Sequence, residues 1–384
     1  TNEGFLERTF RLKENKTDVK TEVLAGITTF MTMAYILIVN PLILSDAGMD
    51  MGGVFTATAL SAVIATLIMA FYANYPFALA PGMGLNAFFA YSVVLGMGHS
   101  WQFALTAVFL EGIIFIVLSL FGVREAIFNA IPMNLKKAVS VGIGLFIACI
   151  GLSNVGIIQQ GDGVILSLGN LGERPALLAL IGLVIMGVLL AKKVKGALLI
   201  GIIVTTIIGI PMGVTEPISG LVKLPPSLKP VAFQFVWDEV FTKDMFVVLF
   251  TFLFVDVFDT IGTLVGVSSK AKMLDKDGKL PKVKQALFAD AVGTVAGSCL
   301  GTSTVTTYVE SASGVAEGGR TGLTSFTTAC LFALALIFSP LFIAVPGAAT
   351  APALILVGLF MMSPIKEIDL EDFTEAIPAF LTII

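Results

Sequence analysis

The sequence predicts an all-α polytopic membrane protein, built as a 7+7 inverted repeat with two discontinuous helices. Three observations carry this prediction. Of the 384 residues, 56% are hydrophobic and only 13% are charged, whereas soluble proteins carry about 25% charged residues. Apolar runs of roughly 20 residues, the length needed to cross a bilayer, recur along the chain. Two runs are interrupted by Gly, Pro or polar residues at matching positions, which is typical of discontinuous helices in an inverted repeat.

Hydropathy places twelve spans, and a thirteenth begins near residue 374. The predicted spans are 21–44, 53–73, 78–95, 102–121, 138–156, 175–191, 196–213, 244–267, 285–300, 303–317, 322–344 and 347–363. With the N-terminus inside, 19 of the 23 Lys and Arg residues fall on inside segments and 4 on outside loops. Because Lys and Arg accumulate on the cytoplasmic side, we expect a multi-pass protein of the plasma (inner) membrane with a cytoplasmic N-terminus.

The two ends of the chain look trimmed. The chain starts without Met, and it stops inside the apolar run 377–384. The polar N-terminus shows no cleavable signal peptide. We therefore expect a chain truncated after about 12 spans, without the last spans of the second repeat.

The third and tenth predicted spans are unlike the others. The third contains Pro81, Gly82 and Asn86 ahead of an aromatic stretch. The tenth, 302–319, is rich in Thr, Ser and Gly and carries Glu310. Non-helical backbone at membrane depth is tolerated only where protein or a water-filled cavity surrounds it, so both segments are expected to line a central site.

The eighth span holds two carboxylates at its middle. Asp256 and Asp259 are three residues apart, which places them on one face of a helix. A charged side chain at the bilayer centre costs at least about 2.5–3.5 kcal/mol, so such residues usually face a cavity and have a function. This pair is therefore the first candidate for the functional site.

Composition excludes several other kinds of site. Cys149, Cys299 and Cys330 are scattered in apolar segments, which predicts neither a disulfide framework nor a metal site. The single histidine, His99, lies in a predicted loop, so a His-based metal cluster or proton relay is not expected. No Walker-type loop is present, so ATP-driven transport is not supported. No catalytic residue, cofactor or nucleic-acid partner is predicted.

Four segments together resemble one known family. They are TTFMTMAYILIVNP (28–41), APGMGLNAFFAY (80–91), FVDVFDTIGTLVGV (254–267) and GTSTVTTYVESASGVAEGGRTGLTS (301–325). They resemble the AzgA-like purine permeases of the nucleobase/ascorbate transporter superfamily. The resemblance implies proton-coupled import of hypoxanthine, guanine or adenine by alternating access, through fourteen spans in which spans 3 and 10 carry short strands.

The resemblance also implies a core domain that moves against a gate domain. On this chain it gives a cytoplasmic N-terminal segment 1–20, core segments 21–121 and 244–345, and gate segments 122–243 and 346–384, the last one incomplete.

Carried onto this chain, the binding residues of the family fall on Asp259, Asp256, Glu310 and Asn86. The chemistry is consistent, because a carboxylate can accept the N–H donors on the edge of a purine through strong, charge-assisted hydrogen bonds. Aromatic candidates for the faces of the ring are Phe88, Phe258 and Tyr308. With no membrane-embedded histidine, the coupling proton is expected on Asp256, Asp259 or Glu310.

Structural roles remain alternatives for several of these residues. Asp256 is the better candidate for a brace between spans, and Asn86 could cap a helix. Glu111 and Asp290 also lie in apolar spans and are interpreted as structural.

Four other functions stay open at this point. A uracil or xanthine permease would share the fold. An anion carrier is disfavoured because no Lys or Arg is predicted beside the mid-membrane acids. An intramembrane aspartic hydrolase would need paired carboxylates on adjacent elements, and a cation channel would need acidic rings. The expected partners are a purine base, a proton and the lipid bilayer, with a homodimer left open.

Overall fold

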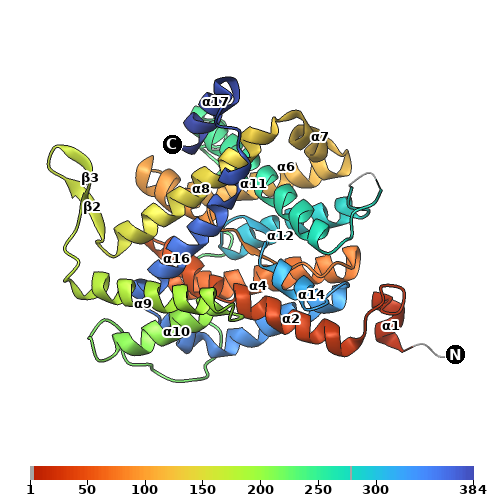
Figure 1. Cartoon of the computed structure of the whole chain (residues 1–384), viewed down its shortest axis with the longest axis horizontal. Coiled ribbons are helices and arrows are strands. Elements are labelled where there is room, and N and C mark those ends of the chain that lie inside the picture. Colours follow the sequence, from red (N-terminus) through yellow and green to blue (C-terminus); the bar gives the residue numbers. More distant parts are fainter. Residues whose placement is uncertain (1–3, 277–278) are drawn as a thin grey trace. The chain divides into compact units, whose positions relative to one another are not determined.

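The computed structural model describes residues 4–276 and 279–384. The chain folds into two compact units, each built from two segments. Figure 1 labels most of the helices and strands that form these units. Unit 1 comprises Thr1–Phe128 and Val222–Ser339, and unit 2 comprises Asn129–Leu221 and Pro340–Ile384.

Unit 1 contains both interrupted spans. Its first segment forms α1 (Phe5–Phe10), α2 (Val19–Met33), α3 (Ile36–Asp46), α4 (Met51–Ile68), the π-helical turn η1 (Met69–Ala73), β1 (Leu79–Pro81), α5 (Leu85–Ala87), the π-helical segment η2 (Phe88–Gly96), α6 (Trp101–Leu120) and the start of α7 (Val123–Ala130). Its second segment forms α11 (Lys243–Lys270), α12 (Val283–Leu300), β4 (Val305–Thr307), α13 (Ser311–Ala316), α14 (Gly322–Ala335), the 3-10 turn η3 (Leu336–Phe338) and the start of α15 (Ser339–Ile343).

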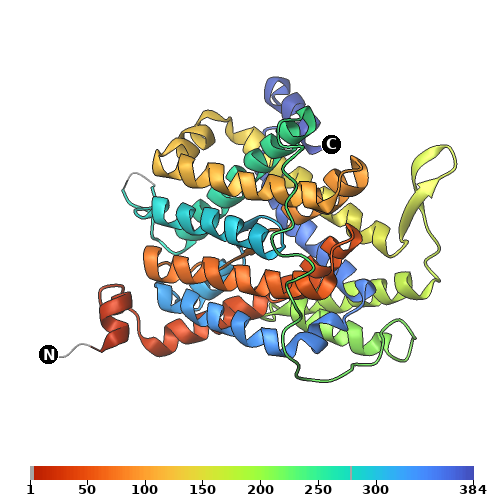
Figure 2. The same cartoon turned by 180° about the vertical axis from the view of Figure 1, so that it is seen from behind.

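The helices of unit 1 pack as a row. α12 lies between α6 and α4, α4 also packs against α14, and α14 packs against α2 (Figure 2). Several helices begin at a side-chain cap, as at Asp18, Asp50 and Ser100, which accept hydrogen bonds from backbone N–H groups of the first turn. Such caps satisfy donors that a helix start otherwise leaves unpaired.

The two interrupted spans meet through their strands. β1 and β4 pair antiparallel, with Leu79 opposite Thr307 and Pro81 opposite Val305. Beyond the ladder, Gly82 N–H donates to the carbonyl of Thr304 at 2.9 Å, and Tyr308 N–H donates to the carbonyl of Ala78 at 2.9 Å. The predicted short strands in spans 3 and 10 are thus present, and both strands are buried.

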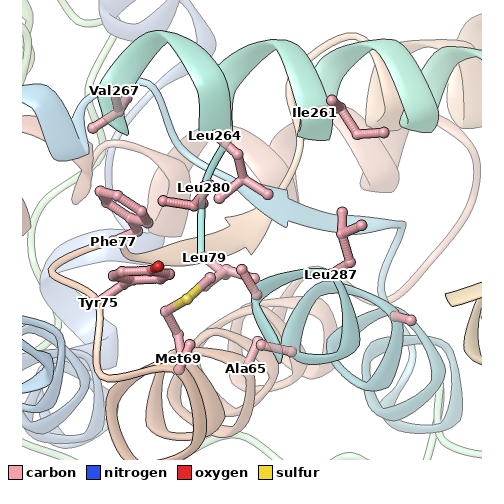
Figure 3. Packing of buried hydrophobic residues seen from close by; sticks show 14 of the residues in the cluster. Ala65, Met69, Tyr75, Phe77, Leu79, Ile261, Leu264, Val267, Leu280 and Leu287 are labelled. Atoms are coloured by element: carbon pink, nitrogen blue, oxygen red, sulfur yellow. The ribbon is translucent and has the colours of Figure 1, made fainter. Parts of the chain in front are cut away.

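A hydrophobic cluster fixes α11 against the strand pair. Ile261, Leu264 and Val267 project from one side of α11 toward the strands, where Leu79 lies (Figure 3). Leu287 of α12 belongs to the same cluster. This packing sets the height and rotation of α11, and therefore the direction of its carboxylates.

Unit 2 is mostly helical. It contains α8 (Met133–Asn154), β2 (Ile158–Gly161), β3 (Val164–Leu168), α9 (Arg174–Ala191), α10 (Ala197–Gly209), α16 (Gly347–Met362), the 3-10 turn η4 (Ser363–Glu367) and α17 (Phe373–Ile383). α8 and α16 approach closely where Gly144 and Gly358 face each other, and a Cβ on either glycine would overlap the carbonyl oxygen of the other. Small residues at helix crossings are typical of membrane proteins.

The prediction of a polytopic helical membrane protein is confirmed. In the described part of the chain, eight helices are long and apolar enough to cross a bilayer: Val19–Asp46, Met51–Ala73, Trp101–Leu120, Met133–Asn154, Arg174–Ala191, Lys243–Ser268, Gly322–Ile343 and Gly347–Glu367. The full span count and the inverted repeat stay predictions.

The sequence did not predict two features of the fold. The first span is broken between α2 and α3, and the connection between the predicted fifth and sixth spans contains the hairpin β2–β3.

Candidate functional site

Two of the predicted carboxylates, Asp259 and Glu310, remain partly exposed. Asp259 lies on α11, and Glu310 is the residue at which α13 begins. The two carboxyl groups are close enough to interact electrostatically. A Cβ built on Gly82, just after β1, would lie 3.6 Å from Asp259 Oδ2. The structure thus brings one carboxylate from each of two helices close together beside the strand pair.

Two tyrosines lie beside these carboxylates. Tyr35, in the break between α2 and α3, donates its hydroxyl hydrogen to Glu310 Oε1 at 2.6 Å. Tyr308 donates to the carbonyl of Pro81 and also interacts electrostatically with Glu310 and Asp259. Both tyrosines are buried. The acceptor oxygens of the two carboxylates therefore share their surroundings with two phenols.

The aromatic candidates differ in their accessibility. Phe88 is partly exposed and packs edge-on against Phe252, with ring centroids 5.0 Å apart. Phe258 is 7% exposed and packs edge-on against Phe254 at 4.6 Å. Phe88 therefore offers the more accessible ring face of the two.

Asn86 lies in a separate buried polar cluster. Its amide nitrogen donates to Asn40 Oδ1 at 3.1 Å, and the amide of Asn40 donates to Thr58 and Thr302, each at 2.8 Å. Within residues 4–276 and 279–384, Asn86 Oδ1 finds no hydrogen-bond partner. Its role in binding remains a prediction.

Asp256 is fully buried and belongs to an ionic network. Arg124 Nη2 lies 3.2 Å from Asp290 Oδ1 and 3.7 Å from Asp256 Oδ2. The guanidinium also donates to the carbonyl of Leu287 at 3.3 Å and lies 3.8 Å from the centre of the Phe115 ring. All three charged side chains are 0% exposed. Asp256 and Asp259 are thus neighbours in sequence but lie in different environments.

A hydroxyl links the two aspartates of this network. Thr260 Oγ1 lies 2.8 Å from Asp256 Oδ1, 2.8 Å from Asp290 Oδ2 and 2.9 Å from Thr306 Oγ1. A hydroxyl carries one hydrogen, so Thr260 can donate to only one of the two carboxylates. The arrangement therefore fits a network in which the other carboxyl group carries a proton.

Glu111 extends the network from α6. Its Oε2 accepts from Thr304 Oγ1 at 2.7 Å, and its carboxyl group lies close enough to Asp256 to interact electrostatically. Glu111 and Asp290, both interpreted as structural from the sequence, are thus partners of a predicted site residue.

Arg124 corrects the statement that no Lys or Arg lies beside the mid-membrane acids. Arg124 follows the predicted fourth span. Its closeness to the end of that span was the one feature of the sequence that could have indicated a contact with the intramembrane acids. The structure turns it inward onto Asp290 and Asp256. Since both of its partners are carboxylates, it is a counter-ion within the protein. Tyr35 was also missed, although a tyrosine within an apolar span needs a partner for its hydroxyl.

In the part of the chain that the structure describes, no group of three His, Cys, Asp or Glu side chains could hold a metal ion. The interacting groups at Asp259 and Glu310 are acceptors and phenols, which suit an organic ligand with N–H donors.

The comparison with known proteins decides the family. A model described as the permease family matches residues 20–384. The chain belongs to this family. The predicted resemblance to purine permeases of the nucleobase/ascorbate transporter superfamily is thereby confirmed. Two curated relatives are similar to this chain over nearly its whole length. The adenine permease AdeP of Escherichia coli is 44% identical over 99% of this chain and 85% of the relative. The guanine/hypoxanthine permease PbuG of Bacillus subtilis is 46% identical over 98% of this chain and 88% of the relative.

Solved structures show where the fold recurs. The transmembrane domain of the cyanobacterial bicarbonate transporter BicA matches with a TM-score of 0.70 over 95% of both chains, at 16% identity. The murine anion transporter Slc26a9 matches with a TM-score of 0.68 over all of this chain and 68% of the other, at 13% identity. At these identities the likeness concerns the fold alone. The chain is thus an integral membrane permease, and nucleobase transport is the function that its relatives support.

Proposed function

We propose that this permease imports purine nucleobases by proton-coupled alternating access. The observation that carries the proposal is the pair of partly exposed carboxylates, Asp259 and Glu310, in a chain whose relatives include adenine and guanine/hypoxanthine permeases. The named substrates of these relatives are flat, neutral rings with N–H donors on their edges. Ionised carboxylates accept such donors through the stronger class of hydrogen bond.

The two carboxylates would accept donors on two edges of the ring, and Phe88 would cover one of its faces. Phe258 and Tyr308 would complete the wall of the site, and Asn86 would support the end of the interrupted third span. This arrangement favours a neutral donor-rich base over an anion, because the carboxylates would repel negative charge.

The coupling proton would be held by Asp256, Asp259 or Glu310. For Asp256 the support is that Thr260 has one hydroxyl hydrogen but contacts both Asp256 and Asp290. This arrangement fits a proton on one of these two carboxyl groups. For Asp259 and Glu310 the support is their partial exposure and mutual repulsion. Alternating access would follow from movement of the core domain against the gate domain. The cytoplasmic N-terminus, the plasma-membrane location and a homodimer belong to the same proposal.

The test is uptake of radiolabelled hypoxanthine into proteoliposomes that contain the full chain, with and without an inward proton gradient. Guanine, adenine, xanthine and uracil serve as competitors. We expect gradient-dependent uptake that guanine or adenine blocks and uracil does not. Competition by uracil or xanthine alone would instead identify a uracil or xanthine permease, and an absence of uptake under every gradient would contradict the proposal.

Two variants connect the function to the site. Asp259→Asn and Glu310→Gln each turn an acceptor oxygen into a donor amide. We expect each to raise the KM for the purine by about 10–100-fold, the cost of losing a hydrogen bond to a charged group. Asp162→Asn, the same change at an exposed residue of the β2–β3 turn, is the matched control. Unchanged uptake by both site variants would contradict the assigned site.

The proton carrier is tested with the amide variants of Asp256, Asp259 and Glu310. We expect at least one of them to exchange purine across the membrane while failing to accumulate it against a gradient. Full proton-driven accumulation by all three would exclude these residues as carriers.

A further inference from the structure

The break in the first span places a phenol at the site. α2 ends at Met33 and α3 begins at Ile36, with Ala34 and Tyr35 between them. Around the break, Leu37 N–H and Ile38 N–H donate to carbonyls only three residues earlier, at 3.1 and 3.0 Å. The chain is thus wound more tightly here than in a regular α-helix, and the side chain of Tyr35 is turned onto Glu310.

The contact between Tyr35 and Glu310 is short and protected. The hydroxyl oxygen lies 2.6 Å from Glu310 Oε1, and Tyr35 is 1% exposed. Distances of about 2.5–2.7 Å are typical of O–H groups that donate to an ionised carboxylate. One oxygen of Glu310 is therefore engaged by the protein, although the side chain as a whole remains partly exposed.

The backbone around Glu310 is held against α2. Thr32 Oγ1 lies 2.9 Å from Ser313 Oγ, and Ser313 Oγ donates to the carbonyl of Glu310 at 2.6 Å. Gly314 packs so closely against α2 that a Cβ there would overlap Thr29 Oγ1. α2 and α13 are therefore held in one register, which keeps the phenol of Tyr35 in reach of the carboxylate.

We propose that Tyr35 is a positioning and specificity-determining residue, which occupies Glu310 Oε1 and leaves Oε2 as the principal oxygen for a substrate N–H. This inference rests on the proposed function. A carboxylate with both oxygens open is best satisfied by two adjacent donors, such as N1–H and the 2-amino group of guanine. In this site the phenol supplies the second donor, so a base with one donor at that edge, such as hypoxanthine, is bound without leaving Oε1 unpaired.

The consequence is a specific change in selectivity when the hydroxyl is removed. In Tyr35→Phe, hypoxanthine leaves Oε1 without a donor, whereas guanine can supply one from its amino group. We expect the Kd for hypoxanthine to rise about 10-fold and the Kd for guanine to rise less than about 3-fold. The guanine preference of the variant therefore increases.

The matched control is Tyr91→Phe. Tyr91 donates to Asp46 Oδ2 at the same distance, 2.6 Å, and the carboxylate that accepts is not a site residue. The substitution removes the same hydroxyl from the same kind of bond. We expect it to leave the guanine-to-hypoxanthine ratio of Kd values unchanged.

The experiment is calorimetric binding of hypoxanthine and guanine to the purified full chain, for the wild type and both variants. The ratio of the two Kd values does not depend on the fraction of folded protein, so partial instability of Tyr35→Phe does not obscure it. If that variant cannot be purified, 3-fluorotyrosine at position 35 keeps the ring and makes the phenol a stronger donor. It is expected to shift the ratio toward hypoxanthine.

The outcomes separate the two proposals. Equal weakening of both bases in Tyr35→Phe, or no weakening, overturns the role of Tyr35 while wild-type binding still supports the proposed function. In the variant with 3-fluorotyrosine, an unchanged ratio of the Kd values for guanine and hypoxanthine likewise overturns the role of Tyr35. A wild-type protein that binds neither base overturns the role of Tyr35, and it overturns the proposed function as well if adenine does not bind either.

Discussion

Replacing Arg124 by methionine removes the guanidinium from the buried ionic network. The substitution keeps an unbranched apolar side chain but eliminates the hydrogen bond to Asp290 at 3.2 Å and the ion pair with Asp256 at 3.7 Å. It also removes the donor to the carbonyl of Leu287 and the cation over the ring of Phe115. Because these groups are buried, water cannot replace the guanidinium.

The expected cost follows from that burial. Removing one partner of a buried ion pair costs about 3–5 kcal/mol, mainly because the remaining charge is left without compensation. We therefore expect Arg124→Met to lose about 3–5 kcal/mol of unfolding free energy. The double variant Arg124→Met/Asp290→Asn removes one charge of each sign, so it is expected to recover a substantial part of this loss.

The assay is unfolding of the purified protein by SDS in mixed micelles, with Arg174→Met as the matched control. Arg174 is exposed, and it donates a long hydrogen bond of 3.4 Å to the carbonyl of Met212. We expect little change for the control. A loss below about 1 kcal/mol for Arg124→Met, or a double variant that is less stable than the single one, would refute the reasoning from buried charge.

Two further substitutions test how unit 1 is held together, by the same unfolding measurement. The buried carboxylate of Glu22 accepts from Thr321 N–H at 3.1 Å and from Thr321 Oγ1 at 2.8 Å. Glu22→Ala leaves these donors unpaired, so we expect it to lower the unfolding free energy by about 1–3 kcal/mol. An unfolding free energy equal to that of the wild type would contradict this. A Cβ on Gly322, the first residue of α14, would overlap the carbonyl oxygen of Ala70, so Gly322→Ala should destabilise by about 1–3 kcal/mol. Gly347→Ala, at the first residue of α16 and with open space around it, is the control, and equal effects of the two changes would show that the close approach is unimportant.

The sequence by itself determined the membrane class and the interruption of two spans. Apolar runs predict spans because a helix must satisfy its backbone within the bilayer, and this constraint acts locally along the chain. Pro81 and Gly82 likewise predict broken helices from local chemistry. The carboxylates within apolar spans were also visible in the sequence, whereas the short strands and the roles of Asp259 and Glu310 in substrate binding came from the resemblance to the family.

Only the tertiary structure decided which carboxylates stay accessible. Asp256 and Asp259 share a helix face by spacing, yet Asp256 is enclosed by Arg124 and Asp290 while Asp259 remains partly exposed. Likewise, nothing in the first span indicated that Tyr35 donates to Glu310, 275 positions further along the chain. The physical reason is that burial and pairing depend on which helices pack together, and those partners are distant in sequence.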